Sequence, residues 1–385
     1  MARAECHDAA AVKALALPAF ALMSGIASRI AARMSLFTPF TLGNVTLRNR
    51  IVVSPMCEYS ACDGVPDDWH LVHLGSRAVG GAGLVFTEAT AVSPEGRISP
   101  VDTGLWNQVQ QNAWKRIADF VHAQGALSGI QLAHAGRKGS TEAPWRGGKA
   151  VAAVEGAWTP VAPSAIAFAD DYPMPAALDD AGIQKVIMDF AASARRAREA
   201  GFGVIEVHAA HGYLLHQFLS PLSNLRRDDY GGSLENRARL LREVMRAVRA
   251  EWPAPRPLFV RVSATDWAPG GWDIDECVEL SRWLKADGAD LIDVSSGGLV
   301  AHAKITVGPG YQVPFAARIR READIATGAV GLITDARQAQ KILDDGDADV
   351  IIMARELLRD PYFPRRAAKE LGAAIEAPKQ YQRAW

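Results

Sequence analysis

From Leu36 onward the chain alternates between short apolar runs and longer segments whose apolar residues recur at helical spacing. The short runs are rich in β-branched residues and contain few polar positions, which is typical of parallel strands buried on both faces. They occupy residues 50–55, 83–90, 127–134, 203–210, 257–264, 291–296, 328–334 and 350–354. The pattern therefore predicts eight buried parallel strands.

The segments between these runs predict helices, most clearly at residues 179–201, 231–252, 274–288 and 335–346. Gly201 suits a C-cap, and Ser233 suits an N-cap with the acidic Glu235 in the first turn. Eight strand–helix alternations predict a (β/α)8 TIM barrel. The alternative, an open doubly wound sheet, usually has a glycine-rich phosphate turn after its first strand. The chain has SPMCEYS there, which favours the barrel.

Three segments fall outside this alternation. Residues 36–49 suggest a hairpin that plugs the N-terminal end of the barrel, and residues 135–178 form a long insertion after strand 3 that suggests a lid. Residues 1–35 are rich in alanine, and we expect a disordered extension or a start codon assigned too early. The apolar run at 15–26 is too short to span a bilayer. We expect one barrel domain over residues 36–385.

Composition narrows the function. The 385 residues carry a formal net charge of -1 and no basic block, so nothing favours nucleic acid as a partner. The 49% hydrophobic content is enough for a sizeable core without a membrane span. The four cysteines are too scattered for a disulfide framework or a zinc site, and they fit a reducing, cytoplasmic setting. They are Cys6, Cys57, Cys62 and Cys277.

The catalytic residues of such barrels lie at the C-terminal ends of the strands. Because side chains alternate along a strand, Glu206, His208 and Arg261 are expected to point toward the barrel axis. A buried arginine needs a carboxylate or another anion beside it. Glu206 on the adjacent strand is one candidate partner for Arg261. An electron-rich ligand across the barrel mouth is the other.

The segment EVHAAHGYLLHQF at 206–218 has three possible interpretations. A metal site would use His208, His211 and His216, but His216 lies in the next loop or helix and no further ligand is evident. The histidines could instead be structural residues satisfied by local hydrogen bonds. Finally, His208 and His211 could donate hydrogen bonds to a substrate oxygen, with Tyr213 as a proton source. We favour this last interpretation, with His216 as a structural residue.

Six segments together resemble the Old Yellow Enzyme family of FMN-dependent ene-reductases. They are SPMCEYS (54–60), QLAHAGRK (131–138), EVHAAHGYLLHQFLSPLSNLRRDDYGGSLENR (206–237), FVRVSATD (259–266), GAVGLITD (328–335) and ARELLRDPYF (354–363). The resemblance covers about residues 35–385. Cys57 with Tyr59, and the ending APKQYQRAW, are similar to the thermophilic-like subgroup.

This resemblance implies a ping-pong reaction in which NADPH or NADH reduces bound FMN and an activated alkene reoxidises it. The alkene would be an unsaturated ketone or aldehyde, a maleimide or a nitroalkene. Hydride would come from flavin N5 and the proton from Tyr213, while His208 and His211 bind the activating oxygen. Tyr59 and Arg383 would also contact substrate, with Arg383 reaching a neighbour's site in a homodimer or homotetramer. The implied FMN-binding residues are Ser54, Pro55, Met56, Cys57, Ala89, Gln131, Arg261, Gly331, Ala354 and Arg355.

Within this resemblance Cys57 would tune the flavin potential. Two positions depart from the family pattern: Ala354 stands where relatives often have glycine, and Glu58 has no role that the resemblance assigns. Three alternatives stay open. Another FMN barrel oxidoreductase would carry a cysteine cluster and a large C-terminal extension, which this chain lacks. A metal-dependent barrel hydrolase would need His208 and His211 as metal ligands, and a non-catalytic binding barrel would show no turnover.

Overall fold

The computed structural model describes residues 34–385, so the expectation for residues 1–35 falls almost wholly outside it. Ser35–Trp385 form one compact unit built on a closed barrel of eight parallel strands. Around the barrel the strands follow the order β10-β11-β12-β3-β4-β5-β8-β9. Their bounds are β3 Ile51–Val53, β4 Leu84–Ala91, β5 Leu127–Ala133, β8 Val204–Ala209, β9 Leu258–Ser263, β10 Leu291–Ser295, β11 Ala326–Ala329 and β12 Val350–Met353. The predicted TIM barrel is confirmed.

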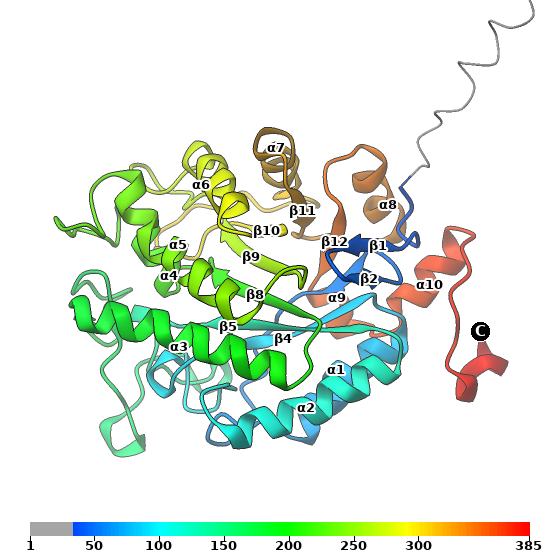
Figure 1. Ribbon diagram of the computed structural model, residues 1–385, viewed down its shortest axis with the longest axis horizontal. Coiled ribbons are helices and arrows are strands. Elements are labelled where there is room, and N and C mark those ends of the chain that lie inside the picture. The colour runs from blue at the N-terminus through cyan, green and yellow to red at the C-terminus, as the bar shows by residue number, and fades with distance from the viewer. Residues whose placement is uncertain (1–33) are drawn as a thin grey trace, which may run out of the picture. The chain divides into compact units, whose positions relative to one another are not determined.

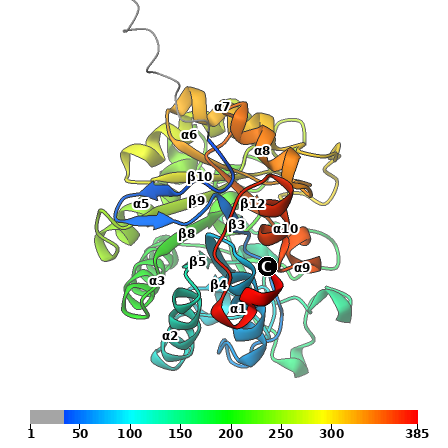
Figure 2. The ribbon, with the colours of Figure 1, turned by 90° about the vertical axis from the view of Figure 1, so that its right-hand side faces the viewer.

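Helices surround the strands on the outside (Figures 1 and 2). They are α1 Asp68–Gly80, α2 Gln108–Ala123, α3 Asp180–Glu199, α4 Leu214–Leu219, α5 Leu234–Glu251, α6 Ile274–Ala286, α7 Val313–Ala323, α8 Ala336–Asp344, α9 Arg355–Arg359 and α10 Phe363–Glu370. Ser233 caps α5 by accepting a 3.3 Å hydrogen bond from the Asn236 backbone N–H. Gly201 follows α3 with a φ of +87°, the left-handed geometry that ends a helix. Both predicted caps are confirmed.

The seventh strand differs from its predicted range of 328–334. β11 runs from Ala326 to Ala329 and pairs in register with Leu291–Val294 of β10. The apolar Leu332 and Ile333 lie in the loop beyond the strand, and Leu332 has a φ of +50°, which a strand does not adopt. The predicted end of the strand is wrong because Leu332 and Ile333, although apolar, belong to a loop and not to the strand.

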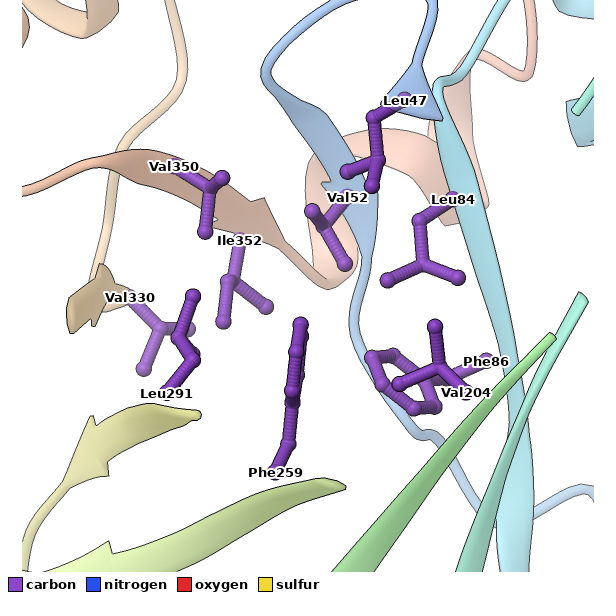
Figure 3. Close-up of a cluster of buried hydrophobic side chains, with 10 residues drawn as sticks. All are labelled: Leu47, Val52, Leu84, Phe86, Val204, Phe259, Leu291, Val330, Val350 and Ile352. Carbon is purple, nitrogen blue, oxygen red and sulfur yellow. The ribbon is translucent and has the colours of Figure 1, made fainter. Parts of the chain in front are cut away.

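The N-terminal end of the barrel is filled by apolar side chains from six of its strands (Figure 3). The cluster is Leu47, Val52, Leu84, Phe86, Val204, Phe259, Leu291, Val330, Val350 and Ile352. Leu47 comes from an antiparallel hairpin of β1 (Phe40–Leu42) and β2 (Val45–Leu47), and it is fully buried. Because β1 and β2 also pack Phe40, Leu42 and Val45 against this cluster, the hairpin closes the base of the barrel.

The insertion after β5 contains short regular pieces. These are three 3-10 turns at Gly136–Lys138, Pro144–Arg146 and Ala153–Glu155, and the short strands β6 (Val161–Ala162) and β7 (Ala176–Ala177). Among the described residues, no helix is long and apolar enough to cross a membrane.

Candidate active site

A layer of polar side chains lies inside the barrel above the apolar base. Gln131 donates from Nε2 to Oε1 of Glu206 at 2.7 Å. Arg261 lies with Nε 3.2 Å from Asp293 Oδ2 and donates from Nη1 to Ser54 Oγ at 3.1 Å. All five side chains are at most 5% exposed. Glu206, the candidate carboxylate partner of Arg261, is therefore wrong: the contacting carboxylate is Asp293, which stands beside Arg261 in the strand register.

This layer holds two carboxyl groups and one guanidinium, all buried. Burial, followed by the proximity of Asp293, raises the pKa of Glu206 well above its usual range. Burial also raises the pKa of Asp293, against the opposing effect of Arg261. Arg261 contacts Asp293 and so favours the ionised form of that carboxyl over the ionised form of Glu206. The guanidinium of Arg261 faces Ser54 near the strand ends.

The His208, His211 and Tyr213 rings meet at the C-terminal end of β8. The His208 ring centroid lies 5.1 Å from that of His211 and 5.0 Å from that of Tyr213, with interplanar angles of 86° and 76°. His208 belongs to β8, His211 has a φ of +57° just past the strand, and Tyr213 is the N-cap residue of α4. The left-handed turn at His211 brings the rings of His208, His211 and Tyr213 together.

Hydrogen bonds constrain both imidazoles. Nδ1 of His208 accepts from the Ala210 backbone N–H at 3.3 Å, which leaves Nε2 to carry the proton of a neutral ring. Nε2 of His211 lies 2.7 Å from Ser295 Oγ. Burial, followed by the charge of Arg261, lowers the pKa of both histidines well below the usual range. Both rings are therefore neutral at physiological pH.

His216 lies apart from this pair. It is fully buried, with Nδ1 accepting from the Gly212 N–H at 2.9 Å and Nε2 lying 3.0 Å from Asp266 Oδ1. Asp266 in turn accepts from the Ser220 hydroxyl at 2.6 Å. His216 is thus a structural residue of the α4 turn. Within residues 34–385, no group of three or more His, Cys, Asp or Glu side chains is arranged to hold a metal ion.

The segment after β3 brings Cys57 and Tyr59 to the barrel mouth. Burial, followed by the charge of Asp102, raises the pKa of the Cys57 thiol well above its usual range, so the thiol is protonated. Tyr59 has a φ of +48°, and its ring meets Trp145 at 5.6 Å in an edge-to-face contact. Trp145 belongs to the insertion after β5, so Tyr59 connects that insertion to the mouth. Pro55 and Met56, between Ser54 and Cys57, are partly exposed.

Three of the residues that the resemblance implies for FMN binding also lie together. Gly331, Ala354 and Arg355 line one cavity of about 100 Å³, which Arg359 lines as well. Gly331 has a φ of +124°, and a Cβ there would lie 3.0 Å from Gln312 Nε2, so glycine is required. Ala354 has a φ of -105° and a ψ of -96°, which lie outside the left-handed region. The departure from glycine at this position therefore requires no left-handed backbone.

Two residues at the mouth were not anticipated from the sequence. Lys138 donates from Nζ to the carbonyl of His211 at 2.9 Å and to that of Gly298 at 2.5 Å. Burial lowers the pKa of Lys138 to about 7. Asp102 is 2% exposed and lines a small cavity together with Tyr213 and Ala89. Lys138 lies within the QLAHAGRK motif, so the motif could have indicated it as a site residue. Nothing in the sequence distinguishes Asp102.

Arg383 is not brought to this site within the chain. It lies exposed in the last 3-10 turn, Lys379–Ala384, close to the C-terminus. Two aromatic contacts hold this turn against the start of α10. The ring centroids of Tyr381 and Trp385 lie 6.5 and 6.3 Å from that of Tyr362. Arg383 itself therefore remains free to meet another molecule.

Sequence comparison decides the family. Residues 35–373 match the NADH:flavin oxidoreductase / NADH oxidase family. The NADPH dehydrogenase of Listeria innocua is 54% identical over 352 residues, which are 91% of this chain and 99% of that protein. The NADPH dehydrogenase of Bacillus subtilis is 50% identical over the same shares. The chain belongs to the NADH:flavin oxidoreductase / NADH oxidase family.

Solved structures of this family place the chain near the Old Yellow Enzymes. Morphinone reductase superposes with a TM-score of 0.74 at 31% identity, over 90% of this chain and 92% of that one. The Old Yellow Enzyme homologue from Zymomonas mobilis gives a TM-score of 0.73 at 29% identity, over 90% and 95% of the two chains. The predicted resemblance is confirmed. The chain is an NAD(P)H-dependent FMN oxidoreductase, with FMN as the bound cofactor and a nicotinamide as the hydride donor.

The residues at the mouth fit FMN on structural grounds. Arg261 Nε and Glu206 Oε2 are buried without a well-formed hydrogen bond, and both belong to the polar layer facing the mouth. The guanidinium of Arg261 suits the electron-rich end of a flavin ring. The cavity at Gly331, Ala354 and Arg355 suits a phosphate, because the loops after strands 7 and 8 bind phosphate in this fold.

Proposed function

We propose that this enzyme is an ene-reductase that reduces the C=C bond of alkenes activated by a carbonyl or nitro group. The observation that carries the proposal is the convergence of two neutral histidines and a tyrosine at the mouth of the barrel. Neutral imidazole N–H groups can bind an oxygen that gains negative charge, and a phenol can deliver a proton nearby. An activated alkene requires both functions at once.

His208 and His211 bind the activating oxygen. His208 presents Nε2–H, because its Nδ1 already accepts from the Ala210 N–H. His211 presents Nδ1–H when the Ser295 hydroxyl donates to its Nε2 across the 2.7 Å contact. The two rings approach from different directions, since their planes differ by 86°. Donors of this kind commonly contribute about 2.7–4 kcal/mol each to the stabilisation of a developing oxyanion.

Tyr213 supplies the proton to the α-carbon of the alkene. Bound FMN would supply the hydride chemistry that connects the nicotinamide to the β-carbon. Burial raises the pKa of Tyr213 well above its usual range, so the phenol keeps its proton until the substrate carbon becomes basic. Lys138 Nζ lies 5.6 Å from the Tyr213 ring centroid, where the protonated form of the amine would stabilise the tyrosinate left after transfer. Tyr59 contributes a further substrate contact at the mouth.

The relatives' names support a reductase acting on an unsaturated organic compound. Morphinone reductase and 2-naphthoyl-CoA reductase are both named for such compounds, and the latter superposes with a TM-score of 0.80 at 28% identity over 88% of this chain. That structure is longer, since the match covers 52% of it. We infer that NADPH is the hydride donor here, as the curated relatives are named NADPH dehydrogenases.

The purified holoenzyme tests this proposal directly. A yellow protein that NADPH bleaches anaerobically, and that cyclohexenone or a maleimide then reoxidises, is the expected result. Bleaching by NADPH without reoxidation by any enone, aldehyde, maleimide or nitroalkene would reject the ene-reductase assignment while leaving the flavoprotein assignment intact. Stoichiometric zinc in place of flavin would reject both.

We also propose a homodimer or homotetramer in which Arg383 reaches a neighbouring active site. The support is its exposed position on the final turn, away from the mouth of its own barrel. Arg383→Ala is expected to raise the KM for the alkene in a protein that keeps its oligomeric state by light scattering. Unchanged kinetics in an intact oligomer would exclude this contact.

A further inference from the structure

Glu58, between Cys57 and Tyr59, has every polar group engaged. Its backbone N–H donates to Glu88 Oε2 at 3.0 Å, and its carbonyl accepts from the Ser60 hydroxyl at 2.8 Å. Its carboxylate Oε2 accepts from Trp69 Nε1 at 2.9 Å, and Oε1 lies 3.3 Å from His73 Nε2. Both Trp69 and His73 belong to α1, on the outer ring of the barrel. Glu58, in the segment after β3, is therefore held against α1.

The neighbouring carboxylate Glu88 is fixed as well. Its Oε1 lies 3.0 Å from His70 Nε2, and His70 is 1% exposed within α1. Burial, followed by the charge of Arg77, lowers the pKa of His73 to about 3, so His73 is neutral. The Glu58–His73 contact is therefore made by a neutral ring to a carboxylate. These contacts hold the residue before Tyr59 both from β4 and from α1.

Tyr59 itself needs such support. Its φ of +48° lies in the left-handed region, which costs a bulky L-residue of the order of 1–3 kcal/mol and persists only where the surroundings impose it. The Tyr59 ring makes one aromatic contact, with Trp145, whose side chain is 69% exposed. A contact to such an exposed ring is weak support. The preceding residue, Glu58, is held at its N–H, its carbonyl and both carboxylate oxygens, so it can impose this conformation.

We propose that Glu58 is the positioning residue for Tyr59: by anchoring to Trp69 and His73 of α1, it holds Tyr59 in the left-handed conformation that presents its ring to substrate. Glu58 acts through Tyr59 and does not itself touch the substrate. The proposal rests on the proposed ene-reductase activity for its kinetic test, and it has a structural test that does not.

The kinetic test is a double-mutant cycle on the FMN-loaded enzyme. Glu58→Ala is expected to raise the KM for cyclohexenone about tenfold, the scale set by releasing a strained backbone, while the kcat changes by less than about threefold. Tyr59→Ala is expected to raise the KM similarly. If Glu58 acts through Tyr59, adding Glu58→Ala to Tyr59→Ala raises the KM no further. Multiplying effects in the double variant would overturn the proposal.

Two further variants separate positioning from general damage. Glu58→Gln keeps an amide oxygen for Trp69 Nε1 and is expected to restore the KM to within about threefold of wild type. The matched control is Glu276→Ala. Glu276 lies on α6, and its carboxylate accepts a hydrogen bond from Arg237 Nη2 at 2.5 Å. This control is expected to leave the KM unchanged. If Glu58→Ala fails to fold, Trp69→Phe removes the same hydrogen bond and takes its place in the cycle.

The structural test uses crystals of the Glu58→Ala holoenzyme. The expected result is a Tyr59 with negative φ and a broken contact to Trp145. A Tyr59 that keeps its φ near +48° and its contact to Trp145 would overturn the proposal, whatever the activity. Failure of every alkene to reoxidise the wild-type flavin would instead reject the proposed function, and this structural result would still decide the role of Glu58.

Discussion

The buried carboxyl of Asp102 gives a prediction that links the mouth to stability. Asp102 is 2% exposed, and it accepts from the Ser99 hydroxyl at 2.5 Å and from the Ile98 N–H at 2.7 Å. Burial raises its pKa from the ordinary value of 3.8 to about 7, despite these hydrogen bonds. A rise of about 3 in pKa, at about 1.36 kcal/mol each, corresponds to roughly 4 kcal/mol of differential stability.

The sign follows from proton linkage. Between about pH 4 and pH 7 the native protein holds a proton on Asp102 that the unfolded chain has already released. The free energy of unfolding therefore falls as the pH rises through this window. Asp102→Asn removes that titration. The free energy of unfolding of the variant minus that of the wild type is expected to grow by about 4 kcal/mol between pH 4 and pH 8.

The assay is urea unfolding of both proteins at a series of pH values, followed by the fluorescence of the ten tryptophans. Altered hydrogen bonds in the variant change its free energy of unfolding by the same amount at every pH. This constant cancels, because the test reads only how the difference between variant and wild type changes with pH. Asp119→Asn, on α2 with its side chain 58% exposed, supplies the comparison for a carboxyl in solvent. A difference for Asp102→Asn that stays within about 1 kcal/mol across the pH range would refute the reasoning.

Three further predictions concern the reaction and the core. Tyr213→Phe should slow flavin reoxidation by an enone about a hundredfold or more while leaving reduction by NADPH nearly unchanged; equal slowing of both in stopped-flow experiments would contradict proton donation. Cys57→Ala should shift the FMN reduction potential, and an unaltered potential in a dye-equilibration titration would contradict its tuning role. Phe259→Ala, in the apolar base of the barrel, should cost about 3–5 kcal/mol in urea unfolding, and a loss below about 1 kcal/mol would show that the base collapses freely.

The barrel could be predicted from sequence because its signals are local. Most of the buried strands are short apolar runs, and caps such as Ser233 and Gly201 mark helix ends by their own chemistry. The seventh strand failed because ATGA at 326–329 has little strand-forming character, whereas the loop residues Leu332 and Ile333 do. Apolar composition alone does not distinguish a strand from a loop that packs against the barrel.

The site was predictable only where residues are close in sequence. His208, His211 and Tyr213 lie within six residues, and one turn brings their rings together. The partner of Arg261 was not predictable, because choosing Asp293 over Glu206 requires knowing which strand lies on which side and in what register. Asp102 acquires its raised pKa from burial by distant segments. Such properties come from tertiary packing, and no periodicity in the sequence encodes them.

The buried polar layer of Gln131, Glu206, Arg261 and Asp293 separates two regions that should tolerate mutation differently. Below it, ten apolar side chains share one packed volume, so changes there must conserve size. Above it, His208 and Tyr213 project from strand and loop ends into the mouth and contribute little to that volume. Directed evolution confined to the mouth should therefore change substrate preference with little loss of melting temperature. The mouth of the barrel can therefore be redesigned, whereas its apolar base has to be kept.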